Sequence, residues 1–195
     1  MDTAELKTAL YDWHVNHGAR MAAFAGYQMP IQYSGIVAEH TATRQMAGVF
    51  DISHMGRLRF DGPRADQLLD RLLTRRVLDM QPGQVRYSLV CNASGGILDD
   101  VLVSCLESPS GKIYFLLVVN ASNKAKIVEW LGPHLVEFPD VEFHDVTDST
   151  AMIAVQGPKS IEVCKKLFPP SVLGLGYYRA KVTEQMSKPD RKSVV

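Results

Sequence analysis

Apolar residues recur three or four positions apart in some stretches of the chain and alternate with polar residues in others. The first pattern predicts helices and the second predicts strands. The predicted strands cover 56–60, 85–91, 97–106, 112–119 and 141–146, and the predicted helices between them cover 65–73 and 122–131. Their order, β-α-β-β-β-α-β, is close to that of a ferredoxin-like unit with one added strand.

The N-terminal segment 1–50 has a different pattern, with two expected helices and an apolar loop. Thr3 is a candidate cap for a helix that ends at Gly18, and Ser34 begins a second helix that ends near Met46. The loop 24–30 between them holds more apolar residues than exposure to water favours. We expect this loop to pack down or to line a site.

A strand, a Gly-Pro pair and a helix follow one another twice in the chain. Gly62-Pro63 joins the strand 56–60 to a helix, and Gly157-Pro158 joins a strand at 152–155 to another helix. Two copies are too few for a repeat array. The recurrence instead predicts an α+β protein of two units, each with an antiparallel sheet flanked by helices. The expected domains are a discontinuous one of 1–50 and 147–195, and an inserted ferredoxin-like one of 51–146.

The composition is that of a globular protein without a strongly charged surface. The chain has 195 residues, 46% of them apolar, and 21 basic and 21 acidic side chains. A balanced charge without long runs of one sign disfavours a nucleic-acid partner. No apolar stretch approaches the roughly 20 residues of a membrane-spanning helix. No secretory signal is visible in 1–10, so a cytoplasmic location is expected.

Cysteine and histidine spacing gives no indication of a metal site. Cys91, Cys105 and Cys164 are far apart and form no CxxC pair, which favours reduced thiols over disulfides or a zinc site. The only ligand-like histidine spacing, His14 with His17, is common by chance. A nucleotide site at Gly95-Gly96 is also disfavoured, because a strand follows the pair instead of the helix that would bind a pyrophosphate.

Two acids, Asp99 and Asp100, lie at the start of the predicted strand 97–106. Aspartate is a poor strand residue, and neighbouring strand residues point to opposite faces, so one of the two should point toward the packed side. A buried carboxylate needs a hydrogen-bond partner or a ligand. The alternative is that both acids only complete the turn.

A second unusual phrase, Asp51-Ile52-Ser53-His54, brings an acid, a hydroxyl and an imidazole together just before a strand. The residues of a hydrolase triad are recognised by their geometry and not by closeness in sequence. A capping or turn role for Asp51 and Ser53 is therefore the favoured interpretation.

Several phrases of the sequence are similar, in one order, to those of a known family. These phrases are 14–21, 24–30, 48–56, Tyr87-Ser88, 92–100, 118–121 and 156–158. From about residue 8 to residue 178 their order and spacing resemble the N-terminal part of the aminomethyltransferase family, the T-protein of the glycine cleavage system.

The resemblance implies a transferase and a set of site residues. Such an enzyme moves a one-carbon unit from the aminomethyl group on the dihydrolipoyl arm of the H-protein to tetrahydrofolate, and ammonia is released. By this resemblance Asp100 is the catalytic carboxylate. The expected folate-binding residues are Met55, Tyr87, Asp100, Asn120, Tyr177 and Tyr178. Tetrahydrofolate is the expected co-substrate, the lipoylated H-protein is the expected protein partner, and no metal is expected.

The chain departs from the family pattern after Tyr178. Roughly half of the usual family length is absent, including a C-terminal barrel domain, so the activity of this chain alone is expected to be impaired. Asp190–Val195 match no family pattern and read like a translated sequencing adapter. Two related functions stay open: a folate-binding iron–sulfur maturation factor, and the folate domain of a dimethylglycine or sarcosine demethylase.

Overall fold

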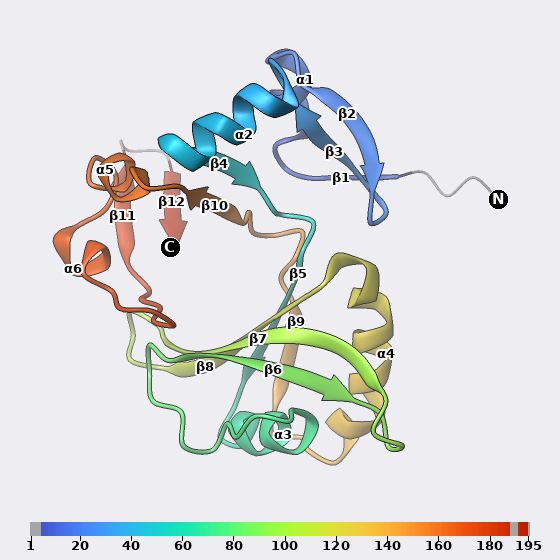
Figure 1. Ribbon diagram of the computed structural model, residues 1–195. Coiled ribbons are helices and arrows are strands. Elements are labelled where there is room, and N and C mark those ends of the chain that lie inside the picture. The colour runs from blue at the N-terminus through green and yellow to red at the C-terminus, as the bar shows by residue number, and fades with distance from the viewer. Residues whose placement is uncertain (1–4, 188–190, 195) are drawn as a thin grey trace. The chain divides into compact units, whose positions relative to one another are not determined.

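The structure is a computed structural model that describes residues 5–187 and 191–194 (Figure 1). The described chain divides into two compact units. The first unit runs up to Met55 and continues from Thr147 to Leu173, and the second comprises Gly56–Val146 and the segment from Gly174 onward. The first unit is thus discontinuous, and the residues after Gly174 group with the second. The expected division into folding domains, 1–50 with 147–195 and 51–146, stays a prediction.

The second unit is built on a five-stranded sheet. Its strands are β5 (Gly56–Asp61), β6 (Val85–Cys91), β7 (Ile97–Glu107), β8 (Ile113–Val119) and β9 (Glu142–Asp145). They lie in the order β6-β7-β8-β5-β9, and every neighbouring pair is antiparallel. The strands predicted from alternation are therefore confirmed to within a residue or two. The name ferredoxin-like for this arrangement stays a prediction.

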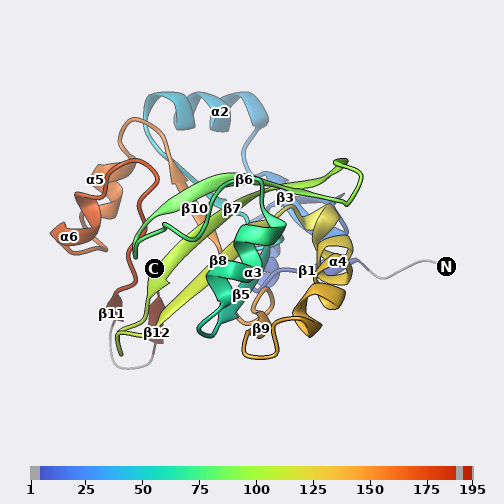
Figure 2. The same cartoon turned by 90° about the horizontal axis from the view of Figure 1, so that it is seen from below.

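Two helices cover one face of this sheet. They are α3 (Ala65–Leu72) and α4 (Lys124–Val136), the latter preceded by the 3-10 turn η1 (Ala121–Asn123). Figure 2 shows α3 in front of the strands and α4 to the right of α3. Leu68 and Leu69 of α3 pack with Ile127 of α4 against Val101 and Val103 of β7, all buried. Between Asp99 and Cys105 the odd-numbered residues of β7 thus face the core, and the even-numbered ones face the side without helices.

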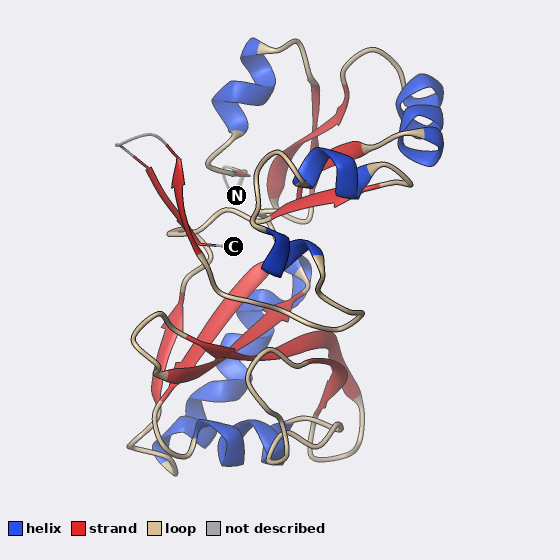
Figure 3. Cartoon of the chain, turned by 90° about the vertical axis from the view of Figure 1, so that its left-hand side faces the viewer, coloured by secondary structure: helices blue, strands red, loops and turns tan. Residues whose placement is uncertain are grey.

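The first unit contains shorter elements, which Figure 3 distinguishes by colour. In chain order they are β1 (Leu6–Lys7), α1 (Tyr11–Asn16), β2 (Arg20–Phe24), β3 (Tyr27–Gln32), α2 (Ile36–Gln45), β4 (Gly48–Asp51), β10 (Ile153–Gln156), α5 (Ser160–Cys164) and α6 (Pro170–Leu173). β4 and β10 form an antiparallel pair, and β3 lies between β1 and β2. Antiparallel pairing thus dominates both units, and the short β1–β3 pair is parallel.

Two expectations for the N-terminal segment are wrong. The first helix begins only at Tyr11, because Leu6 donates its backbone N–H to the Gly26 carbonyl and joins β3 as a short strand; Thr3 lies outside the described residues. The expected loop 24–30 is instead the end of β2, a two-residue turn and the start of β3, although Tyr27 and Met29 within it are buried, as expected for a segment that packs down. Ala25 and Gly26 both have positive φ, 50° and 84°, which suits a two-residue hairpin turn.

The recurring Gly-Pro phrase adopts one conformation in both copies. Gly62 has φ of 119° and Gly157 has φ of 113°, values that L side chains rarely adopt. A Cβ at Gly62 would collide with the Asp140 carbonyl, and one at Gly157 would lie 2.5 Å from the Thr43 carbonyl. In both copies the glycine lies against another backbone segment. Its lack of a Cβ allows the chain to pass there from a strand into a helix.

The C-terminal segment ends in an antiparallel strand pair, β11 (Glu184–Ser187) with β12 (Arg191–Val194). Residues 190 and 195 of the expected adapter-like tail lie outside the described residues. The chain as a whole is an α+β protein with antiparallel sheets and flanking helices, as predicted.

Candidate functional site

The two acids of β7 point to opposite faces of the sheet, as strand geometry requires. Asp99 is 3% exposed and lies on the side of the helices, whereas Asp100 is exposed on the other side. The expectation that one of them points inward is therefore confirmed, and the inward one is Asp99. The acid expected to be catalytic is thus on the side of the sheet that α3 and α4 leave uncovered.

The buried carboxylate of Asp99 is satisfied by two asparagines. It accepts hydrogen bonds from the backbone N–H of Asn120 at 2.9 Å, from Asn120 Nδ2 at 2.9 Å and from Asn123 Nδ2 at 2.6 Å. These partners come from the turn between β8 and α4. Asp99 thereby fixes that turn to the start of β7, which is a structural role that burial of a carboxylate demands.

Asn120 also reaches Asp100. Its Nδ2 donates to Asp100 Oδ1 at 2.9 Å and lies 3.1 Å from the Asp100 carbonyl oxygen. Tyr87 belongs to the same face, because it pairs with Leu102, the residue two positions beyond Asp100 on β7. The ring of Tyr87 is 55% exposed. Asp100 and Tyr87 therefore share one face of this sheet, and Asn120, which follows β8, is hydrogen-bonded to Asp100.

The two C-terminal tyrosines extend this group. The backbone carbonyl of Tyr178 accepts a hydrogen bond from the N–H of Val85 at 3.0 Å, so the chain passes along the start of β6. The Tyr178 ring meets the Tyr87 ring edge-on, with centroids 5.9 Å apart, and the Tyr177 ring at 4.3 Å. A hydrogen bond with Tyr177 raises the pKa of the Tyr178 phenol. The result is an exposed aromatic cluster beside the Asp100 face.

Met55, the remaining predicted residue, belongs to the first unit. It is that unit's last residue before β5, and its backbone N–H donates to the Ile52 carbonyl at 3.0 Å. All of the other predicted site residues belong to the second unit. Their roles in binding and catalysis stay predictions.

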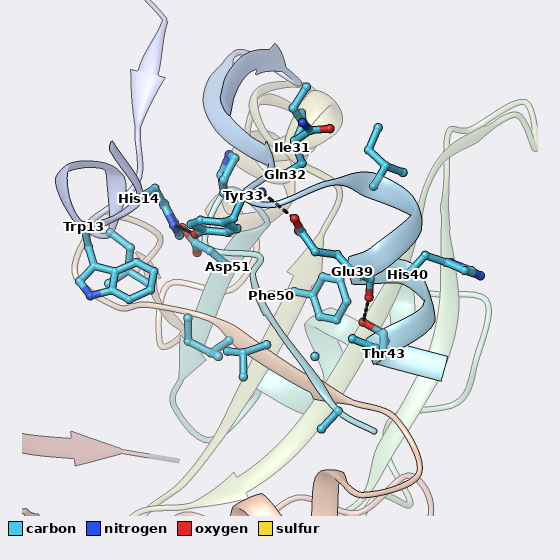
Figure 4. Close-up of a pocket in the computed structure, with 18 residues that line it drawn as sticks. Trp13, His14, Ile31, Gln32, Tyr33, Glu39, His40, Thr43, Phe50 and Asp51 are labelled. Carbon is cyan, nitrogen blue, oxygen red and sulfur yellow. Dashed lines mark hydrogen bonds and ion pairs between the residues drawn. The ribbon is translucent and has the colours of Figure 1, made fainter. Parts of the chain in front are cut away.

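A cavity lies in the first unit (Figure 4), and Pro30 of the segment 24–30 is among the residues that line it. Its volume is about 730 Å³, and α1, β3, α2 and β4 contribute most of its lining. Buried polar groups lie at its edge: His14 Nε2 is 3.0 Å from Asp51 Oδ2, and His14 Nδ1 is 2.6 Å from the Tyr33 hydroxyl. His14 and Asp51 are 37 positions apart in the chain. Only the tertiary fold brings them together, so no local pattern could reveal the pair.

Asp51 is the centre of this polar network. Burial alone would raise the pKa of its carboxyl, but hydrogen bonds from Ser53, His14 and Thr8 outweigh burial and lower that pKa. The Ser53 backbone N–H donates to Asp51 Oδ1 at 2.9 Å, which is the turn role expected for these two residues. The pKa of the Tyr33 phenol is raised by burial and by the nearby Asp51 and Glu39 carboxylates.

Within residues 5–187 and 191–194, no group of three or more His, Cys, Asp or Glu side chains could hold a metal ion. No helix in that part of the chain has the length and apolar character to cross a bilayer.

Comparisons with known proteins converge on one family. A family model described as the GCVT N-terminal domain matches residues 10–189. An aminomethyltransferase of Chlorobium phaeobacteroides is 44% identical over 163 residues, which cover 84% of this chain and 44% of the relative. One of Pelodictyon phaeoclathratiforme is 42% identical over 174 residues, which cover 89% of this chain and 47% of the relative.

A solved structure agrees with these sequence relatives. The crystal structure of glycine cleavage system aminomethyltransferase T from Bartonella henselae superposes with a TM-score of 0.82 at 32% identity, over 91% of this chain and 47% of that one. The chain thus spans a little under half the length of the relatives it matches. Its sequence and its fold both place it in the aminomethyltransferase family, the T-proteins of the glycine cleavage system, whose GCVT N-terminal domain it carries.

Proposed function

We propose that this chain supplies the tetrahydrofolate-binding part of an aminomethyltransferase of glycine cleavage. In the proposed reaction, aminomethyl-dihydrolipoyl H-protein and tetrahydrofolate give methylene-tetrahydrofolate, dihydrolipoyl H-protein and ammonia. The C–S and C–N bonds of the aminomethyl group break, and two C–N bonds to folate nitrogens form. The partners are the lipoylated H-protein and tetrahydrofolate, and the setting is one-carbon metabolism and glycine catabolism in the cytoplasm.

The observation that carries this proposal is a group of side chains at the face of β6 and β7 opposite α3 and α4. Asp100, Asn120, Tyr87 and Tyr178 come from separate segments of the chain, yet contacts link Asp100 to Asn120 and Tyr87 to Tyr178. They are residues that the resemblance assigns to one folate site. A shared face is what a single ligand needs in order to touch all of them.

Each of these side chains suits a reduced pterin. The Asp100 carboxylate is exposed, so it can orient the folate nitrogen that attacks and stabilise positive charge that develops on the iminium-like carbon as ammonia leaves. Tyrosine rings provide flat apolar walls for a heterocycle, and an amide can pair with its polar edge. Met55 is proposed to add a flexible apolar contact.

The two alternative functions gain no support from the comparisons. The relatives named above are aminomethyltransferases, and none of them is named as an iron–sulfur maturation factor or as a dimethylglycine or sarcosine demethylase. Transfer to tetrahydrofolate therefore stands as the proposal.

The test is an isothermal calorimetric titration of the 195-residue chain with tetrahydrofolate under anaerobic conditions. We expect weak but saturable binding, and Asp100→Asn should weaken it by about tenfold, the loss of one charge-assisted hydrogen bond. Glu107→Gln is a matched control, because Glu107 is an exposed acid at the other end of β7. No binding at millimolar tetrahydrofolate, or equal losses in the two variants, would contradict the proposal.

A further inference from the structure

The side-chain amide of Asn120 is held by acceptors on two neighbouring residues. Its Nδ2 lies 2.9 Å from Asp99 Oδ1, 2.9 Å from Asp100 Oδ1 and 3.1 Å from the Asp100 carbonyl oxygen. An asparagine NH2 group has two N–H donors, so three acceptors take up both of them. The nitrogen end of this amide has no donor left for a ligand.

The opposite orientation of the amide is disfavoured by charge. A rotated Asn120 side chain would place Oδ1 against the same three oxygen atoms, and two of these belong to carboxylates. Amide orientation in proteins is assigned from the hydrogen-bond network, and here all three partner atoms are oxygen acceptors. The acids of β7 therefore determine which end of the amide faces outward.

Asp99 can do this because it is itself fixed. It is 3% exposed, and its Oδ2 accepts the Asn120 backbone N–H at 2.9 Å. Asn123 Nδ2 donates to Asp99 Oδ1 at 2.6 Å. The carboxylate is thus held by the backbone on one oxygen and by a second asparagine on the other.

We infer that Asp99 is a positioning residue that locks the Asn120 amide so that its Oδ1 faces the ligand, and that the site thereby selects a ligand edge that donates hydrogen bonds. Within the described residues, no donor is bonded to Asn120 Oδ1 or to Asp100 Oδ2. Neighbouring residues thus offer two acceptor atoms on one face. This inference rests on the proposed folate site, and it specifies a heterocycle that presents N–H or amino groups there.

The first test compares two ligands. Tetrahydrofolate carries an N5–H donor at the reacting end of the pterin, and 5-deaza-tetrahydrofolate has a carbon there and lacks it. We expect the wild-type chain to prefer tetrahydrofolate by about tenfold or more, because a site built to accept a hydrogen bond disfavours a ligand that cannot donate it. Asp99→Asn should reduce that preference to within about twofold, because an amide at position 99 can donate or accept and no longer dictates the orientation of Asn120.

Val101→Ala is the control for loss of stability alone. Val101 is the next inward-facing residue on β7 and is 1% exposed, so its truncation weakens the same region without touching the amide. We expect Val101→Ala to keep the ligand preference. If Asp99→Asn does not fold, Asn123→Ala removes one of the hydrogen bonds that hold Asp99, and a smaller loss of preference, about threefold, is expected. An unchanged preference in a folded Asp99→Asn or Asn123→Ala variant would overturn the inference.

A second measurement needs no ligand and separates this inference from the proposed function. In the free chain, NMR should show the Asn120 side-chain NH2 protons exchanging with water at least about tenfold more slowly than those of an exposed asparagine, and Asp99→Asn should abolish the difference. Fast exchange in the wild type would overturn the inference that Asp99 fixes the Asn120 amide, whatever ligand the site binds. Slow exchange together with no binding of tetrahydrofolate supports the lock and removes the proposed function.

Discussion

Asp51 is a side chain whose ionised form is stabilised by the fold. Its carboxylate is 1% exposed and accepts hydrogen bonds from Thr8 at 2.7 Å and from the Ser53 N–H at 2.9 Å, with His14 Nε2 at 3.0 Å. Because the pKa is lower in the folded state than in the unfolded state, the unfolded state binds the proton more readily. The resulting stability is present above the unfolded value of roughly 4 and is lost as the pH falls through the folded value.

Asp51→Asn should therefore lower the free energy of unfolding at pH 7 by about 1–3 kcal/mol, since an amide replaces one of two acceptor oxygens and faces donors. The difference from wild type should shrink as the pH falls below about 4. Urea denaturation at a series of pH values measures both effects. Asp12→Asn is the control, because Asp12 is an exposed acid of α1. A stability difference that does not change with pH would contradict this account.

At the level of single residues, the sequence left two alternatives for which acid of β7 is buried and did not decide between them. Strand alternation required Asp99 and Asp100 to face opposite sides, and only the position of the helices shows that Asp99 is the buried one. The hydrogen bonds that satisfy it come from Asn120 and Asn123, more than twenty positions away. Such partners depend on the tertiary fold, which periodicity does not encode.

Gly62 controls how β5 connects to α3. Its φ of 119° is strained for any L side chain, and a Cβ there would collide with the Asp140 carbonyl before β9. Gly132 in α4 offers a matched comparison, because nothing lies within 4 Å of a Cβ built there.

We expect Gly62→Ala to lower the free energy of unfolding by more than about 2 kcal/mol, from strain together with the collision. Gly132→Ala should change it by less than about 1 kcal/mol, because the better helix propensity of alanine is opposed by the contact of its Cβ with the following Pro133. Thermal melts of the two variants beside wild type provide the measurement. If both substitutions changed the free energy of unfolding by the same amount, steric contact at Gly62 would not be the reason for glycine there.

Helices and strands with a strong apolar period were predicted well. Elements whose bounds depend on tertiary packing or on an unusual turn were not. β6 was predicted with the bounds that the structure has, because its alternating residues lie on two different faces of a large sheet. The β2–β3 hairpin was missed because its turn is Ala-Gly, which lacks the usual Asn-Gly or Asp-Gly signal. α4 continues past its expected end at Leu131 to Val136, through Pro133, where packing against the sheet maintains the helix.

Buried apolar side chains are distributed unequally over the whole molecule. The hydrophobic core cluster lies entirely within Leu58–Val141 of the second unit. In the described part of the first unit, Tyr27 and Met29 are the buried large apolar side chains, and Trp13, Val37 and Val49 are at least half exposed. Local stability follows buried apolar contacts, so the two units should differ in how readily they open.

Hydrogen exchange should show this difference. We expect amides of the β2–β3 hairpin to exchange through openings that cost at least about 2 kcal/mol less than those of the β7–β8 pair. Both are antiparallel ladders, so the comparison isolates the contribution of the core. Mass spectrometry of deuterium uptake over a range of times gives the two values. Equal protection would mean that the first unit is as stable as the second.

The fold class could be predicted from the sequence, because the apolar periods of strands and helices are visible in short stretches of the chain. The division into units was harder to anticipate. Gly174 and the residues after it group with the second unit through backbone contacts such as that between Tyr178 and Val85. No local pattern near Tyr178 indicates that partner.

The pairing of β4 with β10 has an evolutionary consequence. Gly48 lies opposite Gln156 and Asp51 opposite Ile153, so the polypeptide leaves and re-enters the first unit through two adjacent strands. The residues between β4 and β10 therefore form an insertion. Over evolution this insertion can change in length or sequence while the hydrogen-bonded register of β4 with β10 is kept.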